Sequence, residues 1–149
     1  MRQRSAIVLG TIMFACGWMV ANAQQKPTPG GYVLERDSQV ATTEPGTHNG
    51  GGQTTAYSFF AQAPQLGLVF RKRALHTGAA IGYHRQDEDE IYYVVSGTGV
   101  LTLNGVESIV GPGTAILTRP GSSHALRQQG SEDLVIIIVY QQPSHGRAP

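Results

Sequence analysis

The stretch of sequence that decides the fold runs Gly78-Ala-Ala-Ile-Gly-Tyr-His84-Arg-Gln86-Asp-Glu-Asp-Glu90-Ile-Tyr-Tyr-Val-Val-Ser-Gly97. If both ends of this stretch are strands, alternate residues face the same side of a sheet. His84 and Gln86 then share one face of the first strand, and Glu90 begins one face of the second. The short acidic link between the two strands lets the chain double back. The pattern therefore predicts that His84, Gln86 and Glu90 converge inside a barrel.

A second segment supplies a further candidate ligand. Gly111-Pro112-Gly113 turns the chain sharply, and Pro120-Gly121 does so again. His124 follows the second of these turns. Imidazole nitrogens bind many transition metals, and a carboxylate adds a charged oxygen ligand. His84, Glu90 and His124 are therefore predicted to form a site of two histidines and one carboxylate, with open positions for a substrate or water.

These two segments resemble the paired motifs of the cupin superfamily, and the resemblance covers most of residues 75–140. It implies an all-β fold, the cupin-type double-stranded β-helix or jelly-roll barrel, with little helix. It also implies one divalent transition metal, either Fe, Mn, Ni, Co, Cu or Zn. The residues that carry the resemblance are Gly78, His84, Glu90 and Gly97 in the first motif and Gly113, Gly121 and His124 in the second.

Three positions depart from the family pattern. Gln86 stands where the family has a second histidine ligand, Arg119 occupies the usual proline position, and Gln128 replaces a terminal asparagine. The Gln86 amide can offer its carbonyl oxygen to a metal, or it can donate a hydrogen bond to a bound substrate or water. The predicted ligand set is therefore His84, Gln86, Glu90 and His124, with the role of Gln86 left open.

The first 23 residues have the pattern of a signal peptide. Arg2 and Arg4 precede a largely apolar run from Ala6 to Val20, and Ala21-Asn22-Ala23 fits a small-x-small cleavage site. The apolar run is shorter than the roughly 20 residues that a membrane span needs. We therefore expect an exported protein, periplasmic or secreted, with no membrane attachment after cleavage. An uncleaved anchor is the alternative.

The chain after the predicted cleavage site is expected to form one domain. Residues 24–31 indicate a flexible linker, residues 32–141 a single cupin domain and residues 142–149 a mobile tail. Beyond the leader, nine Lys and Arg face ten Asp and Glu, which gives no electrostatic case for nucleic acid. Cys16, the only cysteine, lies in the leader, so the mature domain has no disulfide and no thiolate ligand.

Short apolar runs separated by glycine-rich turns predict many strands. Asn104-Gly105 between two such runs is a strong hairpin signal, and the β-branched run from Leu134 to Tyr140 indicates a buried strand. Residues 32–36 are interpreted as a first short strand and residues 42–55 as the longest irregular stretch. The pattern contains no convincing amphipathic helix. Arg71-Lys72-Arg73 is interpreted as a solvated edge or rim, because consecutive charges on a strand cannot all face one way.

Three further residues are candidates for the substrate pocket. His48 lies in a glycine-rich segment and either rims the pocket or is a solvated loop residue. Tyr92 shares a strand face with Glu90, so it either lines the pocket or packs in the barrel. Arg119 either binds an anionic substrate or sits at the rim.

Two classes of function are consistent with this sequence. The first is an exported metalloenzyme of oxygenase, isomerase or lyase type that acts on a small substrate, with Glu90 as a proton acceptor. The second is a module that binds a small molecule or a metal without turnover. The sequence shows no Ser-His-Asp or Cys-His arrangement for nucleophilic hydrolysis. Small cupins commonly form dimers. The apolar run from Leu134 to Tyr140 and an N-terminal strand at the barrel edge are also expected to leave pairing groups that need cover, so a homodimer is expected.

Overall fold

The computed structural model describes residues 30–142. The predicted leader at residues 1–23, residues 24–29 of the predicted linker and residues 143–149 of the predicted tail lie outside the described residues. In chain order the elements are α1 (Asp37–Val40), β1 (Ala41–Pro45), β2 (Gln53–Phe59), β3 (Leu68–Leu75), β4 (Ala80–Arg85), β5 (Glu90–Ser96), β6 (Thr98–Leu103), β7 (Val106–Val110), β8 (Ala115–Thr118), β9 (Ser123–Gln129) and β10 (Leu134–Gln141).

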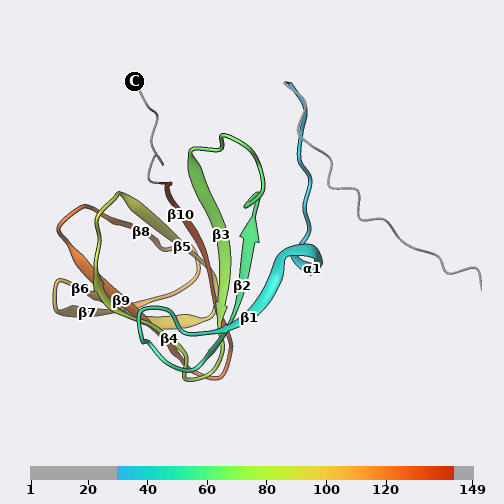
Figure 1. The fold of residues 1–149 in the computed structure, drawn as a ribbon. Helices are drawn as coiled ribbons and strands as arrows, with labels where there is room; N and C mark the ends of the chain where they lie inside the picture. The colour runs from blue at the N-terminus through green and yellow to red at the C-terminus, as the bar shows by residue number, and fades with distance from the viewer. Residues whose placement is uncertain (1–29, 143–149) are drawn as a thin grey trace, which may run out of the picture.

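The strands form two antiparallel sheets that enclose a common interior (Figure 1). The larger sheet has the order β1-β2-β3-β10-β5-β8, and the smaller sheet has the order β4-β9-β6-β7. The acidic link predicted between the two motif strands carries the chain from β4 in the smaller sheet to β5 in the larger one. The all-β, cupin-type barrel predicted from the sequence is confirmed.

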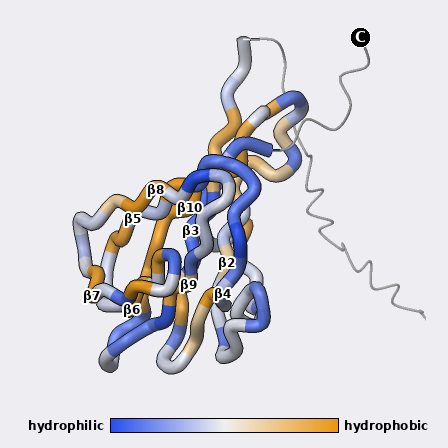
Figure 2. Tube along the Cα trace, turned by 90° about the vertical axis from the view of Figure 1, so that its left-hand side faces the viewer, coloured by the Kyte–Doolittle hydropathy of each residue, from blue (hydrophilic) through white to orange (hydrophobic). Residues whose placement is uncertain are grey.

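Alternation of buried and exposed residues explains why β5 forms. Tyr92 and Val94 are buried with Glu90, whereas Ile91 and Tyr93 lie on the outer face. Hydrophobic segments run along β5 and β8 in Figure 2. Burial of the inward side chains supplies the main favourable free energy of folding. The core joins both sheets through Leu75, Ile81, Val94, Leu101, Leu126, Leu134 and Ile136.

The run from Leu134 to Tyr140 forms a strand as predicted, but it lies inside the sheet. β10 pairs with β3 on one side and with β5 on the other, so its backbone groups are satisfied within the chain. The open edges of the larger sheet are β1 and β8 instead. The association argument based on this run as an edge strand is therefore wrong.

Other local predictions have mixed outcomes. Asn104 and Gly105 have φ values of 47° and 83° and join β6 to β7, which confirms the predicted hairpin. Residues 32–36 form no strand, and α1 follows them, capped at Arg36 by the Gln39 side chain. Residues 42–55 contain β1 and the start of β2 and are therefore less irregular than predicted. Over residues 30–142, no helix is long and apolar enough to cross a membrane.

Candidate metal centre and ligand cavity

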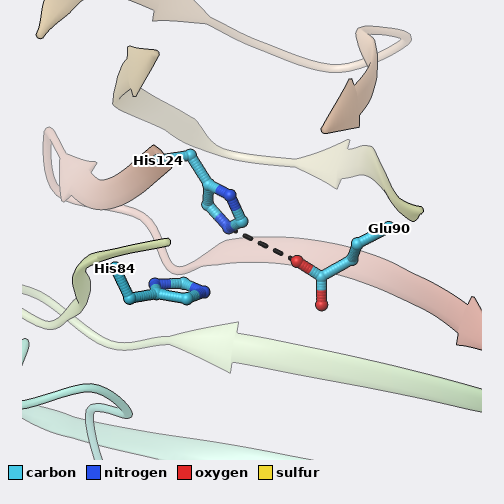
Figure 3. A group of neighbouring side chains, drawn as sticks. All are labelled: His84, Glu90 and His124. Carbon is cyan, nitrogen blue, oxygen red and sulfur yellow. Dashed lines mark ion pairs between the residues drawn. The ribbon is translucent and has the colours of Figure 1, made fainter. Parts of the chain in front are cut away.

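The three predicted ligands come from three strands that meet at one end of the barrel. His84 on β4 is in register with His124 on the neighbouring strand β9. Glu90 begins β5 in the other sheet, where it is in register with Thr118 and Tyr140. Because all three positions face the interior, their side chains point toward one another across the space between the sheets (Figure 3).

The polar atoms of these three side chains are close enough to share one ion. One ligand atom from each of His84, Glu90 and His124 lies within 4.8 Å of the others. Nε2 of His124 lies 3.4 Å from Oε2 of Glu90. Two ligand atoms bound to one metal at about 2.1 Å each are separated by about 3.0–3.4 Å, so this spacing fits shared coordination.

Hydrogen bonding fixes the orientation of the His84 ring. Its Nδ1 lies 2.8 Å from the carbonyl oxygen of Gly82, so Nδ1 carries the proton and donates it to that oxygen. The lone pair of Nε2 is then free to bind a metal, and backbone partners of this kind commonly set the tautomer of metal-binding histidines.

His48 packs directly on this ring. The two rings are parallel to within 4°, with centroids 3.5 Å apart. His48 has a left-handed φ of 53°, a conformation that few residues other than glycine adopt. Its loop, residues 46–52, lies on β4 through Gly82 N–H, which donates to the carbonyl of Thr47 at 2.9 Å. The loop therefore fixes one face of the His84 ring.

Burial sets the charge state of the site in the absence of a cation. Burial raises the pKa of Glu90 to about 7, and Glu88 adds to this shift, while Tyr92 and Arg71 oppose it. Burial, followed by the nearby His84 and His48, lowers the pKa of His124 to about 4. Near neutral pH, His124 is therefore an uncharged imidazole with a lone pair to offer, and Glu90 is poised between acid and carboxylate.

The residues present fit a divalent transition metal. Oε2 of Glu90 is buried and has no hydrogen-bond partner. A buried carboxylate oxygen without a partner is costly, and a cation at this position would satisfy it. Two imidazole nitrogens and one carboxylate oxygen form a donor set that suits Fe, Mn, Co, Ni, Cu or Zn.

A cavity of about 260 Å³ opens beside the candidate ligands. Gln86 is buried to 5% exposure and lines it, while its backbone N–H and C=O bond to Ser122 and Gly121. Tyr92 also lines the cavity, and its hydroxyl lies 3.1 Å from Nε2 of His124. The other lining residues are Thr47, His48, Arg71, Arg73, Ile81, His84, Arg85, Asp87, Glu88, Glu90, Ile138 and Tyr140.

Arg119 does not reach this cavity. Its side chain is 72% exposed and pairs with Asp89, with 3.2 Å between Nε and Oδ1. The backbone N–H of Arg119 donates to the hydroxyl oxygen of Ser122 at 3.1 Å, and the arginine side chain lies at the outer rim. The prediction of Arg119 as a pocket residue is not supported by its position.

Two arginines that the sequence analysis assigned to a solvated rim lie inside the barrel. Arg71 and Arg73 line the cavity, and Arg73 is only 3% exposed. Lys72 between them faces outward and pairs with Asp37. The rim interpretation of residues 71–73 is therefore wrong. The alternation of a strand was the signal that could have separated Lys72 from its two neighbours.

Known proteins are similar to this chain over the same region. Residues 73–140 match the cupin domain family. The oxalate-binding protein of Thermotoga maritima is 33% identical over 72 residues, which make up 48% of this chain and 60% of that relative. The matched region therefore spans only part of the curated relative.

Solved structures extend the similarity to the fold. A predicted oxalate decarboxylase from Thermotoga maritima has a TM-score of 0.68 at 25% identity, covering 74% of this chain and all of that one. A cupin 2 conserved barrel domain protein from Rhodopseudomonas palustris has a TM-score of 0.59 at 16% identity, covering 80% of this chain and 79% of that one. With its two spaced motifs, its two-sheet barrel and these similarities, the region of residues 73–140 is a cupin domain.

Proposed function

We propose that this chain is a metal-dependent cupin enzyme that acts on a small molecule in the cavity beside His84, Glu90 and His124. The observation that supports this most strongly is the convergence of three ligand atoms within 4.8 Å, one of them a buried carboxylate oxygen without a partner. A metal with three protein ligands supplies a Lewis acid with positions open to substrate.

The chain's own residues supply orientation and a proton acceptor. The Gly82 carbonyl and the His48 ring hold His84 in one orientation. Gln86 lines the cavity and can present its amide to a metal or to a bound ligand. Glu90 can accept a proton when its carboxylate is not engaged with a cation, and a pKa of about 7 suits that role near neutral pH.

The second candidate function is ligand binding without turnover. One observation favours it: the curated relative that is 33% identical to this chain is called an oxalate-binding protein. By contrast, the structure with a TM-score of 0.68 is called a predicted oxalate decarboxylase. Both names make oxalate a suitable first probe for this cavity.

One experiment separates these functions. Protein purified without a histidine tag is loaded with Mn²⁺, Co²⁺ or Fe²⁺ and incubated with oxalate while formate and CO₂ are measured. Turnover in proportion to metal content supports the enzyme. Oxalate binding by fully loaded protein without product supports the binding module. Protein that holds no metal after loading contradicts the metal-dependent enzyme, and protein that in addition binds no oxalate contradicts an oxalate-binding module as well.

The pKa of Glu90 predicts a pH dependence of metal affinity. Below pH 7 a metal has to displace a proton from Glu90, whereas His124 is already neutral because its pKa is about 4. We therefore expect the apparent affinity to rise by up to about tenfold per pH unit as the pH approaches 7, and then to level off. Calorimetric titration with Mn²⁺ over this range measures it. An affinity that does not change with pH would contradict the assignment of Glu90 as a ligand.

The pKa values of Glu90 and His124 also predict how the stability of the metal-free protein depends on pH. The pKa of Glu90 is raised in the folded state, so its contribution is present at low pH and is lost as the pH rises through about 7. The lowered pKa of His124 acts in the opposite direction, but only below the usual histidine value of 6.5. We therefore expect the melting temperature of metal-free protein to change little between about pH 4.5 and 6.5, where the two effects oppose each other, to fall between pH 6.5 and about 7, and to level off above that. Bound metal should remove this fall.

We also propose that the chain forms a homodimer and is exported. The outer face of β5 and β8 exposes an apolar cluster formed by Ile91, Tyr93, Val95 and Leu117, each 46–54% exposed. Such clusters often mark association surfaces. Export to the periplasm or the medium is supported by the leader pattern of residues 1–23 alone.

We expect light scattering to give a dimeric mass for the wild-type protein and a monomeric mass for Tyr93→Lys. Val106→Lys is the matched control, because Val106 is 71% exposed on β7, outside this cluster. A monomeric wild-type protein, or a Tyr93→Lys variant that remains dimeric, would contradict the proposal that this apolar cluster forms the dimer interface.

A further inference from the structure

Arg71 is a cation in the cavity wall that has no anionic partner among residues 30–142. It lies on β3, lines the 260 Å³ cavity, and has a buried Nε without a hydrogen-bond partner. The ion pairs found over residues 30–142 do not include it. Burying part of a guanidinium without a partner is costly, so the protein retains here a charge that its own contacts do not satisfy.

The neighbouring arginine on the same face is different. Arg73 donates from Nη1 to the Thr54 hydroxyl at 2.8 Å and forms an ion pair with Glu44. Its charge is therefore balanced inside the protein, and its role is to join β3 to β1 and β2. The contrast indicates that Arg71 is not simply a second structural arginine.

The sheet register places Arg71 on the same wall of the cavity as Glu90. Arg71 is in register with Ile138 on β10, and Ile138 is in register with Tyr92 on β5. Strands about 4.8 Å apart place the Cα atoms of Arg71 and Tyr92 about 10 Å apart on one face. The next inward position on β5 beyond Tyr92 is Glu90. A guanidinium therefore faces the ligand cavity from the side opposite His84 and His124.

Glu90 does not take up this charge. Its Oε2 faces Nε2 of His124 at 3.4 Å, and it forms no ion pair with Arg71. Both groups line the same cavity, so one small ligand can contact both.

We propose that Arg71 is a specificity-determining residue that binds a carboxylate of the ligand, while a second oxygen-bearing group of the same molecule binds at the His84–Glu90–His124 site. A guanidinium binds a carboxylate with two parallel hydrogen bonds, a geometry that lysine does not match. The ligand class is therefore a small dicarboxylate or a hydroxy- or oxo-carboxylate that fits within about 260 Å³. This inference rests on the proposed function, because the second anchor is the metal.

The test compares Arg71 with an arginine outside the cavity. Arg71→Gln and the matched control Arg127→Gln each remove one positive charge, but Arg127 is exposed on β9 and does not line the cavity. Metal content is measured first, and oxalate is then titrated into each metal-loaded protein by calorimetry. We expect Arg71→Gln to keep its metal and to bind oxalate about 10–100-fold more weakly, as the loss of a charged hydrogen-bond donor predicts. Arg127→Gln should bind oxalate nearly as the wild type does.

The melting temperature distinguishes a ligand-binding arginine from a structural one. Because Arg71 pairs with no anion in the part of the chain that the structure describes, Arg71→Gln should leave the melting temperature of the ligand-free protein unchanged or raise it. The same variant should lose most of the stabilisation that oxalate gives to the wild type. A lowered melting temperature without ligand would assign Arg71 to the structure and overturn the inference.

The outcomes separate the two proposals. Wild-type protein that holds no metal contradicts the proposed function. Wild-type protein that holds metal, paired with an Arg71→Gln variant that binds oxalate as tightly, contradicts only the role of Arg71. Metal-loaded wild-type protein that binds neither oxalate nor glycolate overturns the ligand class.

Discussion

Replacing His124 with alanine is expected to abolish stoichiometric metal binding. His124 is 1% exposed, and its Nε2 faces the Glu90 carboxylate at 3.4 Å, so it is placed to bind the same ion as Glu90. We expect His84→Ala to have the same effect, because removing one of three strong ligands leaves too few to hold the ion. The affinity should fall by more than the roughly 10–100-fold that changes around a metal site typically cost. Elemental analysis after dialysis measures the loss.

Changes at Gln86 should have a different result. Gln86→His should keep or tighten metal binding, because imidazole is a better ligand than an amide oxygen. Gln86→Ala should retain metal and change activity by about 10–100-fold. His76→Ala is the matched control, since His76 bonds to Thr55 and Asp133 away from the cavity. Wild-type metal content in His84→Ala or His124→Ala would place the metal elsewhere.

Replacing Gly82 with alanine is expected to destabilise the fold strongly, although it adds only one methyl group. A Cβ at this position would lie 2.0 Å from the carbonyl oxygen of His48, and backbone cannot move aside as a flexible side chain can. We expect the free energy of unfolding to fall by about 2–4 kcal/mol. The melting temperature should fall by about 10 °C, measured by calorimetry.

The Gly82→Ala substitution should also weaken the metal site. The carbonyl of Gly82 accepts the proton of His84 Nδ1, and its N–H bonds to Thr47 of the loop that carries His48. Any Gly82→Ala protein that folds should therefore bind metal more weakly. Gly111→Ala is the control, because a Cβ there meets nothing within 4 Å. Equal stability of the two variants would show that the loop does not rest on β4 in solution.

Local patterns predicted much of the fold. Alternation in Glu90–Ser96, the β-branched run of β10 and the Asn104-Gly105 turn each indicated their element, because strand faces and tight turns depend on neighbouring residues. The predicted strand at residues 32–36 is not formed, since short segments at the chain's periphery depend on what they pack against. The position of β10 between β3 and β5 is likewise a property of the whole sheet.

At the candidate site too, local patterns predicted which residues share a strand face but not which distant segments come into contact. Strand alternation and two motifs were enough to predict that His84, Glu90 and His124 converge, and the structure brings them together. Arg71 was missed because three consecutive charges were treated as one exposed unit. The stack of His48 on His84 follows from a close backbone contact at Gly82, and a sequence does not show which distant segment fills the space beside a glycine.

The most direct test of the central claim is to locate the metal. Crystals of Co²⁺- or Mn²⁺-loaded protein are measured at the absorption edge of the bound metal. The arrangement of His84, Glu90 and His124 predicts a single anomalous peak per chain, within bonding distance of one atom from each residue. A peak elsewhere in the domain, or none in protein shown to be loaded and folded, would contradict the account.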